Sequence, residues 1–178
     1  MIPPTSVVRV DPMLPQEAGA VADLIRTIIA PLPYYNEQAR HGEIAKHTAT
    51  DLQRAIAGDP LSVAVARQDG RMVGFSVTRF DDFLIWIAWL GVLPDARRSG
   101  IARAILADID RTASLRGCHK IWADSRTDNP AMAQLFPAAG YQRVATFERH
   151  WYGQDFFFWQ KFVSGPERTA CGSPGQAS

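Results

Sequence analysis

The stretch from Val92 to Ala102 constrains this chain more than any other segment. It follows an apolar run, Ile85 to Leu90, which predicts a buried strand. It leads into an amphipathic segment whose apolar residues recur at four-residue spacing, as in a helix: Ile101, Ile105, Ile109 and Ala113. Pro94 has no N–H to donate, so the strand ends there, and Gly100 removes a side chain where the helix begins. A buried strand therefore passes into a helix through a short basic turn.

This turn has the properties of an anion site. The first N–H groups of a helix lack intrahelical partners and lie at the positive end of its dipole. Arg97 and Arg98 add two positive charges beside them. The turn contains neither Gly-Lys-Ser/Thr, which a nucleoside triphosphatase needs, nor Gly-x-Gly-x-x-Gly, which is typical of dinucleotide-binding folds. We therefore predict a phosphate cradle of a different kind.

Composition limits the class of protein. The chain of 178 residues is 47% hydrophobic and 21% charged, which suits one globular domain. Its 19 Lys and Arg nearly balance its 18 Asp and Glu, and this argues against a nucleic-acid partner. No uncharged run is long enough to span a bilayer, and no secretory signal is evident, so we expect a cytoplasmic protein without a membrane partner. We expect one domain over residues 1–163 and a disordered tail over 164–178, where Ser, Gly, Pro and Ala dominate.

The order of predicted elements indicates an α/β (α+β) fold with a mixed, mostly antiparallel central sheet of six to seven strands and helices on both faces. We expect a first strand at Val7–Val10, a helix over 15–29, and a second helical region from Glu37, broken near His41–Gly42, with a capping box at Thr50–Gln53. An Asp69-Gly70 turn joins two further strands. After the buried strand, the helix from Gly100 and the strand Lys120–Asp124 predict a right-handed parallel crossover.

Three segments resemble the GNAT superfamily of acetyl-coenzyme A dependent N-acetyltransferases. The first is Arg97-x-x-Gly100-x-Ala102, similar to the coenzyme pyrophosphate loop of that family. The second is Asn129 to Tyr141, similar to the family's Asn-x-x-Ala-x-x-Leu-Tyr-x-x-x-Gly-Phe segment once one extra residue is allowed. The third is the aromatic hairpin His150 to Lys161. The resemblance implies the GNAT fold, acetyl-coenzyme A as cosubstrate, and direct acetyl transfer to an amine.

The resemblance also implies a set of coenzyme-binding residues. Leu90 to Val92 would offer backbone N–H groups, and we expect Gly91 to mark a bulge or a close backbone approach. The full set is Leu90, Gly91, Val92, Arg97, Arg98, Ser99, Gly100, Ile101, Ala102, Asn129, Ala133 and Phe136. No pattern of metal ligands is present, so we expect no metal.

The acid and base are harder to identify. Family members often have a tyrosine where Phe136 stands, and phenylalanine has no proton to give to a thiolate. The buried strand also lacks the carboxylate that relatives carry. We therefore name Asp82, at the entrance of that strand, and Tyr152 as catalytic candidates, with Asp81, Asp124, Tyr141 and His150 as alternatives.

The acceptor is predicted only as a class. Four aromatic residues, with Asp81 and Glu148 near them in sequence, would form an aromatic and acidic pocket for a cationic amine: Tyr34, Tyr35, Trp86 and Trp151. The amine could belong to a small molecule, or to a peptide or protein. Two alternatives remain open: a non-catalytic acyl-coenzyme A binding module, or a homodimeric interaction module that uses the aromatic hairpin.

Overall fold

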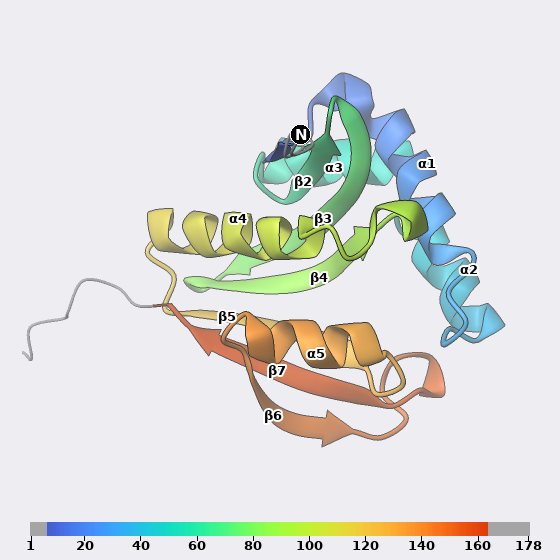
Figure 1. The fold of residues 1–178 in the computed structure, drawn as a ribbon, viewed down its shortest axis with the longest axis vertical. Helices are drawn as coiled ribbons and strands as arrows, with labels where there is room; N and C mark the ends of the chain where they lie inside the picture. The colour runs from blue at the N-terminus through green and yellow to red at the C-terminus, as the bar shows by residue number, and fades with distance from the viewer. Residues whose placement is uncertain (1–6, 164–178) are drawn as a thin grey trace, which may run out of the picture.

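The computed structural model describes residues 7–163. A single mixed sheet of seven strands, in the order β1-β2-β3-β4-β5-β7-β6, forms its centre, with helices packed on both faces (Figure 1). Only the β4–β5 pair is parallel. The predicted fold class is therefore confirmed, whereas the predicted tail over 164–178 lies outside the described residues.

The N-terminal third contains one strand and three helices. Strand β1 (Val8–Pro12) and the 3-10 turn η1 (Pro15–Glu17) precede α1 (Ala18–Ile29), α2 (Glu37–Ala45) and α3 (Ala49–Gly58). The predicted break near His41–Gly42 is wrong, because α2 runs through it. The predicted capping box at Thr50 is also displaced: the N-cap of α3 is Thr48, whose side chain accepts the Asp51 N–H. The sequence offers two threonines two residues apart, and the helix begins after the earlier one.

Three antiparallel strands lead to the basic turn. Strand β2 (Val63–Gln68) pairs with β3 (Arg71–Asp81) across the Asp69-Gly70 turn, where both residues have positive φ, and β3 pairs with β4 (Leu84–Val92). Of the two expectations for Gly91, a bulge or a close approach, the bulge is wrong: it lies opposite Val77 and Thr78, where Ala88 has no partner. A Cβ on Gly91 would lie 2.6 Å from Phe75 Cε1, so this glycine is required by core packing.

The bulge has a consequence for side-chain direction. In a regular strand, side chains two residues apart point to the same face of the sheet. Across a bulge with one extra residue, side chains three residues apart do so. Trp86 pairs with Arg79, and Trp89 pairs with Val77. Both tryptophans therefore project from the same face of β4, toward α2 and α3.

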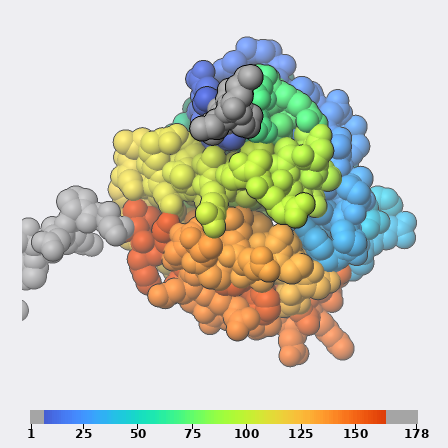
Figure 2. All heavy atoms as spheres, viewed as in Figure 1, coloured from blue at the N-terminus to red at the C-terminus, as the bar shows by residue number. Residues whose placement is uncertain are grey.

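The two faces of the sheet are covered by different helices. On one face, α4 (Ile101–Leu115) packs Ile101 and Ile105 against β3 at Gly74. On the other, α1 packs Ile28 beside Phe75 and Gly91. Helix α5 (Pro130–Ala138) lies on the α4 side, and seen from there these two helices cover much of the sheet (Figure 1; Figure 2).

The C-terminal strands extend the sheet beyond β5 (Lys120–Arg126). Strand β6 (Gln142–Phe147) forms the edge and pairs with β7 (Phe156–Phe162), which pairs with β5 along its whole length. The 3-10 turn η3 (Trp151–Gly153) joins them, and Tyr152 within it has a φ of 54°. No helix among residues 7–163 is long and apolar enough to cross a membrane.

Candidate functional site

Strands β4 and β5 separate at the middle of the sheet. Their pairing ends at Ile87 and Ala123, yet β4 continues to Val92 and β5 to Arg126. The other edges of both strands remain paired, with β3 and β7. The facing edges beyond Ile87 and Ala123 therefore carry backbone N–H and C=O groups that no strand satisfies, and an extended ligand can take that place.

The basic turn lies at the end of this opening. After η2 (Pro94–Ala96), Gly100 caps α4 in the left-handed conformation, with a φ of 87°. Arg97 Nε donates to the Val92 carbonyl at 3.3 Å, and Ser99 Oγ donates to Ala96 O at 2.6 Å. Among the described residues, neither Arg97 nor Arg98 forms an ion pair with a carboxylate, and both are exposed. The turn therefore presents uncompensated positive charge at the N-terminus of a helix of 15 residues.

Helix α5 begins beside the same opening. Asn129 caps it by accepting the Met132 N–H at 3.3 Å, while its Nδ2 donates to Tyr34 Oη at 3.1 Å. The Asn129 side chain therefore leaves the hydroxyl hydrogen of Tyr34 available to another acceptor. Phe136, in the same helix, is buried against Tyr141 and Trp159, with ring centroids at 5.0 and 5.5 Å.

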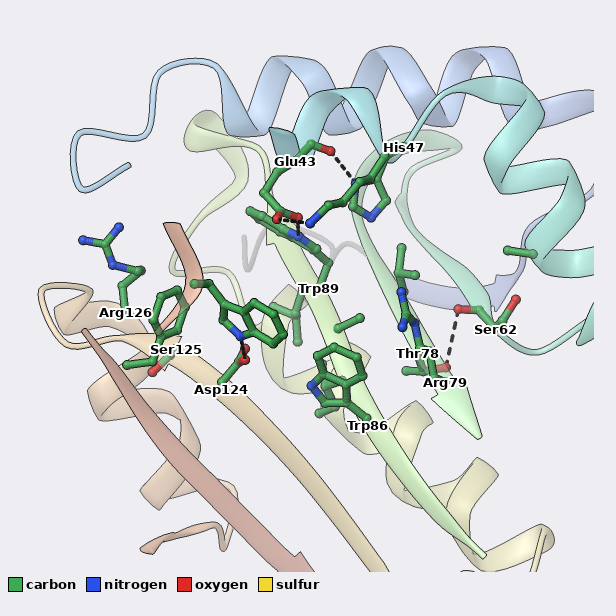
Figure 3. A pocket seen from close by; sticks show the side chains of 18 of the residues that line it. Glu43, His47, Ser62, Thr78, Arg79, Trp86, Trp89, Asp124, Ser125 and Arg126 are labelled. Atoms are coloured by element: carbon green, nitrogen blue, oxygen red, sulfur yellow. Dashed lines mark hydrogen bonds and ion pairs between the residues drawn. The ribbon is translucent and has the colours of Figure 1, made fainter. Parts of the chain in front are cut away.

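A cavity of about 1050 Å³ lies between helices α2 and α3 and strands β4 and β5 (Figure 3). Residues from distant parts of the chain line it. One end of the cavity includes Tyr34, Tyr35, Asn129 and Phe136, and the other includes Asp59, Ser62, Arg79 and Phe80. Asn129 caps α5 and Phe136 belongs to it; this helix begins beside the opening between β4 and β5, and both residues also line the cavity. The cavity therefore joins that opening. We call it the acceptor cavity.

Glu43 on α2 connects three elements at the wall of the acceptor cavity. Its carboxylate accepts from Trp89 Nε1 at 2.6 Å, Tyr152 Oη at 2.7 Å and Lys46 Nζ at 3.1 Å. Burial disfavours the charged carboxylate, but these three hydrogen bonds outweigh burial and hold the pKa of Glu43 below its usual value. Glu43 is therefore an ionised group whose charge is already compensated. Gly42 makes this contact possible, since a Cβ there would lie 2.6 Å from Tyr152 Oη.

Asp124, near the end of β5, differs from Glu43 because no cation of the described residues compensates its carboxyl group. Burial in the cavity wall raises its pKa to about 6, although Trp151 Nε1 donates to its Oδ2 at 2.7 Å and His150 lies close enough to lower it. No cation forms an ion pair with it among residues 7–163. A carboxyl group whose pKa lies near neutrality can gain or lose a proton under ordinary conditions.

Arg126 lies two residues further along β5, and its side chain is 5% exposed. It contacts Asp128 at 3.1 Å and lies over the rings of Tyr35 and Phe156, while its Nε and Nη1 have no hydrogen-bond partner. In Figure 3 its guanidinium points away from Asp124. We assign it to the support of the cavity wall.

The structure brings together most residues predicted from the sequence. Tyr34, Tyr35, Trp86, Trp151 and Tyr152 all line the acceptor cavity, while their roles in binding and catalysis stay predictions. Asp82 does not line the cavity. It occupies the exposed turn between β3 and β4, with a φ of 45°.

Several residues of the site were missed or underrated. Glu43, Trp89 and Arg79 were not named, and Asp124 was only an alternative. A signal existed for Asp124, because a carboxylate in an apolar strand, next to the crossover, is unusual. None existed for Glu43, which stands in an ordinary polar helix. Among residues 7–163 no group of three or more His, Cys, Asp or Glu side chains is arranged to hold a metal ion.

Comparison with known proteins adds a family match and a set of relatives. The model of the family described as "Acetyltransferase (GNAT) family" matches residues 25–141. An acetyltransferase of Pectobacterium atrosepticum is 33% identical over 94 residues, which are 53% of this chain and 67% of the relative. An acetyltransferase of Sodalis glossinidius is 33% identical over 92 residues, 52% of this chain and 65% of the relative.

Solved structures with the same fold are more distant in sequence. The acetyltransferase of the GNAT family from Streptococcus pneumoniae has a TM-score of 0.76 at 13% identity, covering 89% of this chain and 100% of that one. The PaiA N-acetyltransferase of Thermoplasma acidophilum, solved in complex with coenzyme A, has a TM-score of 0.73 at 14% identity, covering 88% of this chain and 99% of that one.

Proposed function

The chain belongs to the Acetyltransferase (GNAT) family, and from this premise we propose that it transfers the acetyl group of acetyl-coenzyme A to a primary amine bound in the acceptor cavity. Acetyl transfer follows from the family, and the residue roles below are inferences from the geometry. One observation carries the proposal: the unpaired edges of β4 and β5 connect the Arg97–Ala102 turn with a cavity that contains Asp124.

The coenzyme would lie along the opening between β4 and β5. Arg97, Arg98 and the first N–H groups of α4 would bind its pyrophosphate, and the free edge of β4 at Leu90–Val92 would hydrogen-bond its extended arm. Acetyl-coenzyme A supplies the acetyl group as an activated thioester. Backbone N–H groups of β4 that are fixed by the sheet would stabilise the negative charge on the acetyl oxygen. In support of a coenzyme site in this fold, the PaiA structure was solved in complex with coenzyme A.

Asp124 is our candidate for the general base in place of Asp82. An amine acceptor arrives largely protonated at neutral pH and must lose a proton before it can attack. With a pKa of about 6, Asp124 is mostly ionised at pH 7 and can receive that proton directly or through a water. Trp151 Nε1 holds one carboxylate oxygen, so the orientation of the group is fixed.

Tyr34 is our candidate for the proton donor that Phe136 cannot be. Its Oη lies 3.1 Å from Asn129 Nδ2 at the start of α5. Burial raises the pKa of Tyr34, and Arg97 of the basic turn opposes that effect, which places the phenol within electrostatic reach of the predicted pyrophosphate site. Tyr152 is less suited, because its hydroxyl already donates to Glu43.

The experiment has two stages. Thermal unfolding with and without acetyl-coenzyme A tests the cradle: a ligand at ~100 times its dissociation constant adds about 2.7 kcal/mol of stability. Release of free coenzyme thiol is then followed with a panel of small amines and peptides. Transfer that falls ~100-fold or more in Asp124→Asn, and about tenfold in Tyr34→Phe, supports the two roles. Full activity of Asp124→Asn would remove Asp124 from the mechanism.

The non-catalytic alternative retains one specific observation, the absence of a hydroxyl at Phe136. Stabilisation by acetyl-coenzyme A without thiol release for any amine would favour it. The cytoplasmic location and the homodimer stay predictions.

A further inference from the structure

The acceptor cavity extends well beyond Asp124. Its far end is formed by Ser62, Arg79 and Phe80, and Figure 3 shows Trp86 between Asp124 and Arg79. The strand registers define this geometry, because Arg79 pairs with Trp86 and Trp86 pairs with Trp122. Arg79, Trp86 and Trp122 thus form a row across β3, β4 and β5, on the same face of the sheet as Asp124.

Arg79 is an exposed cation at the mouth of this end of the cavity. Its guanidinium carbon lies 5.0 Å from the ring centroid of Trp86, which orients it. No carboxylate forms an ion pair with it within residues 7–163. The carboxylates that line the same end have other partners: Asp59 binds Arg116 at 2.8 and 2.5 Å, and Asp51 binds Arg54 at 3.0 Å.

Two neighbouring hydrogen-bond donors are also unsatisfied. Trp86 Nε1 and Ser62 Oγ are buried, line the cavity, and have no hydrogen-bond partner. Ser62 is 6% exposed. Neither atom is accessible from the cavity as it stands, so a ligand could reach them only after the neighbouring side chains move. The far end of the cavity therefore offers one free positive charge and no free carboxylate among the described residues.

We propose that the acceptor carries, besides its primary amine, an anionic group, a carboxylate or a phosphate, which binds Arg79 at the far end of the cavity while the amine lies at Asp124. This inference rests on the proposed function and specifies its substrate class. It replaces the expectation of a purely cationic acceptor in an acidic pocket, because Glu43 and Asp59 are already compensated by Lys46 and Arg116.

The spacing of the two charges sets the length of the acceptor. Arg79 and Trp122 are two strands apart, and Asp124 lies two residues beyond Trp122. With strands about 4.8 Å apart and a rise of about 3.3 Å per residue, the Cα atoms of Arg79 and Asp124 lie about 12 Å apart. The side chains of Arg79 and Asp124 shorten this span, so about 12 Å is an upper limit for the distance between the amine and the anion.

The test uses linear amines of increasing length that differ only at the far end. For each length, kcat/KM is measured for the ω-amino carboxylate, the ω-aminoalkyl phosphate, the diamine and the plain alkylamine. In the wild type we expect an anionic acceptor of optimal length to exceed its alkylamine by roughly 2- to 5-fold, the usual range for an ion pair at an exposed side chain. Comparison of the carboxylate and phosphate series identifies which anion is preferred.

Two variants of Arg79 and one control isolate the contact. Arg79→Gln should bring the ratio of anionic acceptor to alkylamine close to one, and Arg79→Glu should transfer the preference to the diamine. The control is Arg26→Gln, an exposed arginine of α1 whose partner is Asp23, and it should keep the wild-type ratio. Unchanged melting temperatures would show that the variants fold.

Calorimetric binding in the presence of coenzyme A separates this inference from the proposed function. Binding of anionic amines that is lost in Arg79→Gln supports the subsite even if no acetyl transfer is found, in which case the proposed function alone fails. Acetyl transfer to plain amines and diamines, with no gain from an anion at any length or an unchanged ratio in Arg79→Gln, would overturn the inference and leave the proposed function intact.

Discussion

Asp124→Asn should make the protein more stable and less active at the same time. The carboxyl of Asp124 has a pKa of about 6 in the folded protein and an ordinary value of 3.8 when exposed. This difference corresponds to about 3 kcal/mol between the two protonation states. Asparagine has nearly the same shape and can accept the Trp151 N–H, but it is never charged.

The sign of the effect follows from proton binding. Between pH 3.8 and about 6 the folded protein holds the Asp124 proton and the unfolded chain has lost it. Its contribution to stability is therefore fully present below pH 3.8 and is lost as the pH rises through about 6. At pH 4 we expect wild type and Asp124→Asn to unfold at similar urea concentrations, whereas at pH 8 the variant should be about 1–3 kcal/mol more stable.

Urea unfolding at several pH values measures this difference without knowledge of the acceptor. Because other carboxylates titrate alike in both proteins, their contributions cancel in the comparison. Asp82→Asn is the matched control, since Asp82 is exposed and outside the cavity. A stability difference for Asp124→Asn that does not change with pH, or a less stable variant at pH 8, would refute the assignment of a half-buried carboxyl without an ion pair.

Three further predictions concern single contacts. Arg97→Glu should abolish the thermal stabilisation by acetyl-coenzyme A, because it places a negative charge beside the pyrophosphate; an unchanged shift would exclude the turn as the cradle. Gly91→Ala should cost about 1–3 kcal/mol in urea unfolding, since its Cβ would lie 2.6 Å from a carbon of Phe75, which is fully buried. Gly42→Ala should displace the Tyr152 hydroxyl, 2.6 Å from the new Cβ, and lower kcat/KM for every amine; retention of full activity would show that this contact does not shape the cavity.

Local patterns predicted the elements and the turn between β4 and α4 well. The apolar run of β4, the Asp69-Gly70 turn and the Gly100 start of α4 each depend on interactions within a few residues. The same holds for Asn129, which caps α5 through a hydrogen bond from Met132 N–H in the first turn of that helix. Where two local choices were equivalent, as for the cap of α3 at Thr48 or Thr50, the sequence did not discriminate.

The acceptor cavity depends on contacts between distant segments. Tyr152 reaches Glu43 across 109 positions and Trp151 reaches Asp124 across 27, and no periodicity encodes such distances. The side of β4 on which Trp89 projects depends on a bulge at Ala88 that only the register with β3 reveals. For this reason the sequence pointed to Asp82, the nearest carboxylate along the chain, rather than to Asp124.

The sequence by itself therefore determined the class of fold, the strand-turn-helix that can hold a pyrophosphate, and the family resemblance. All three depend on patterns within short segments of the chain. The tertiary structure decided which carboxylates are compensated and which are free. Asp59 is paired with Arg116 from another element, and Glu43 with Lys46 of its own helix and with the donors Trp89 and Tyr152 from other elements. Asp124 and Arg79 have no ion pair among residues 7–163. Charge compensation is a property of neighbours in space, and it is this property that defines the proposed acceptor.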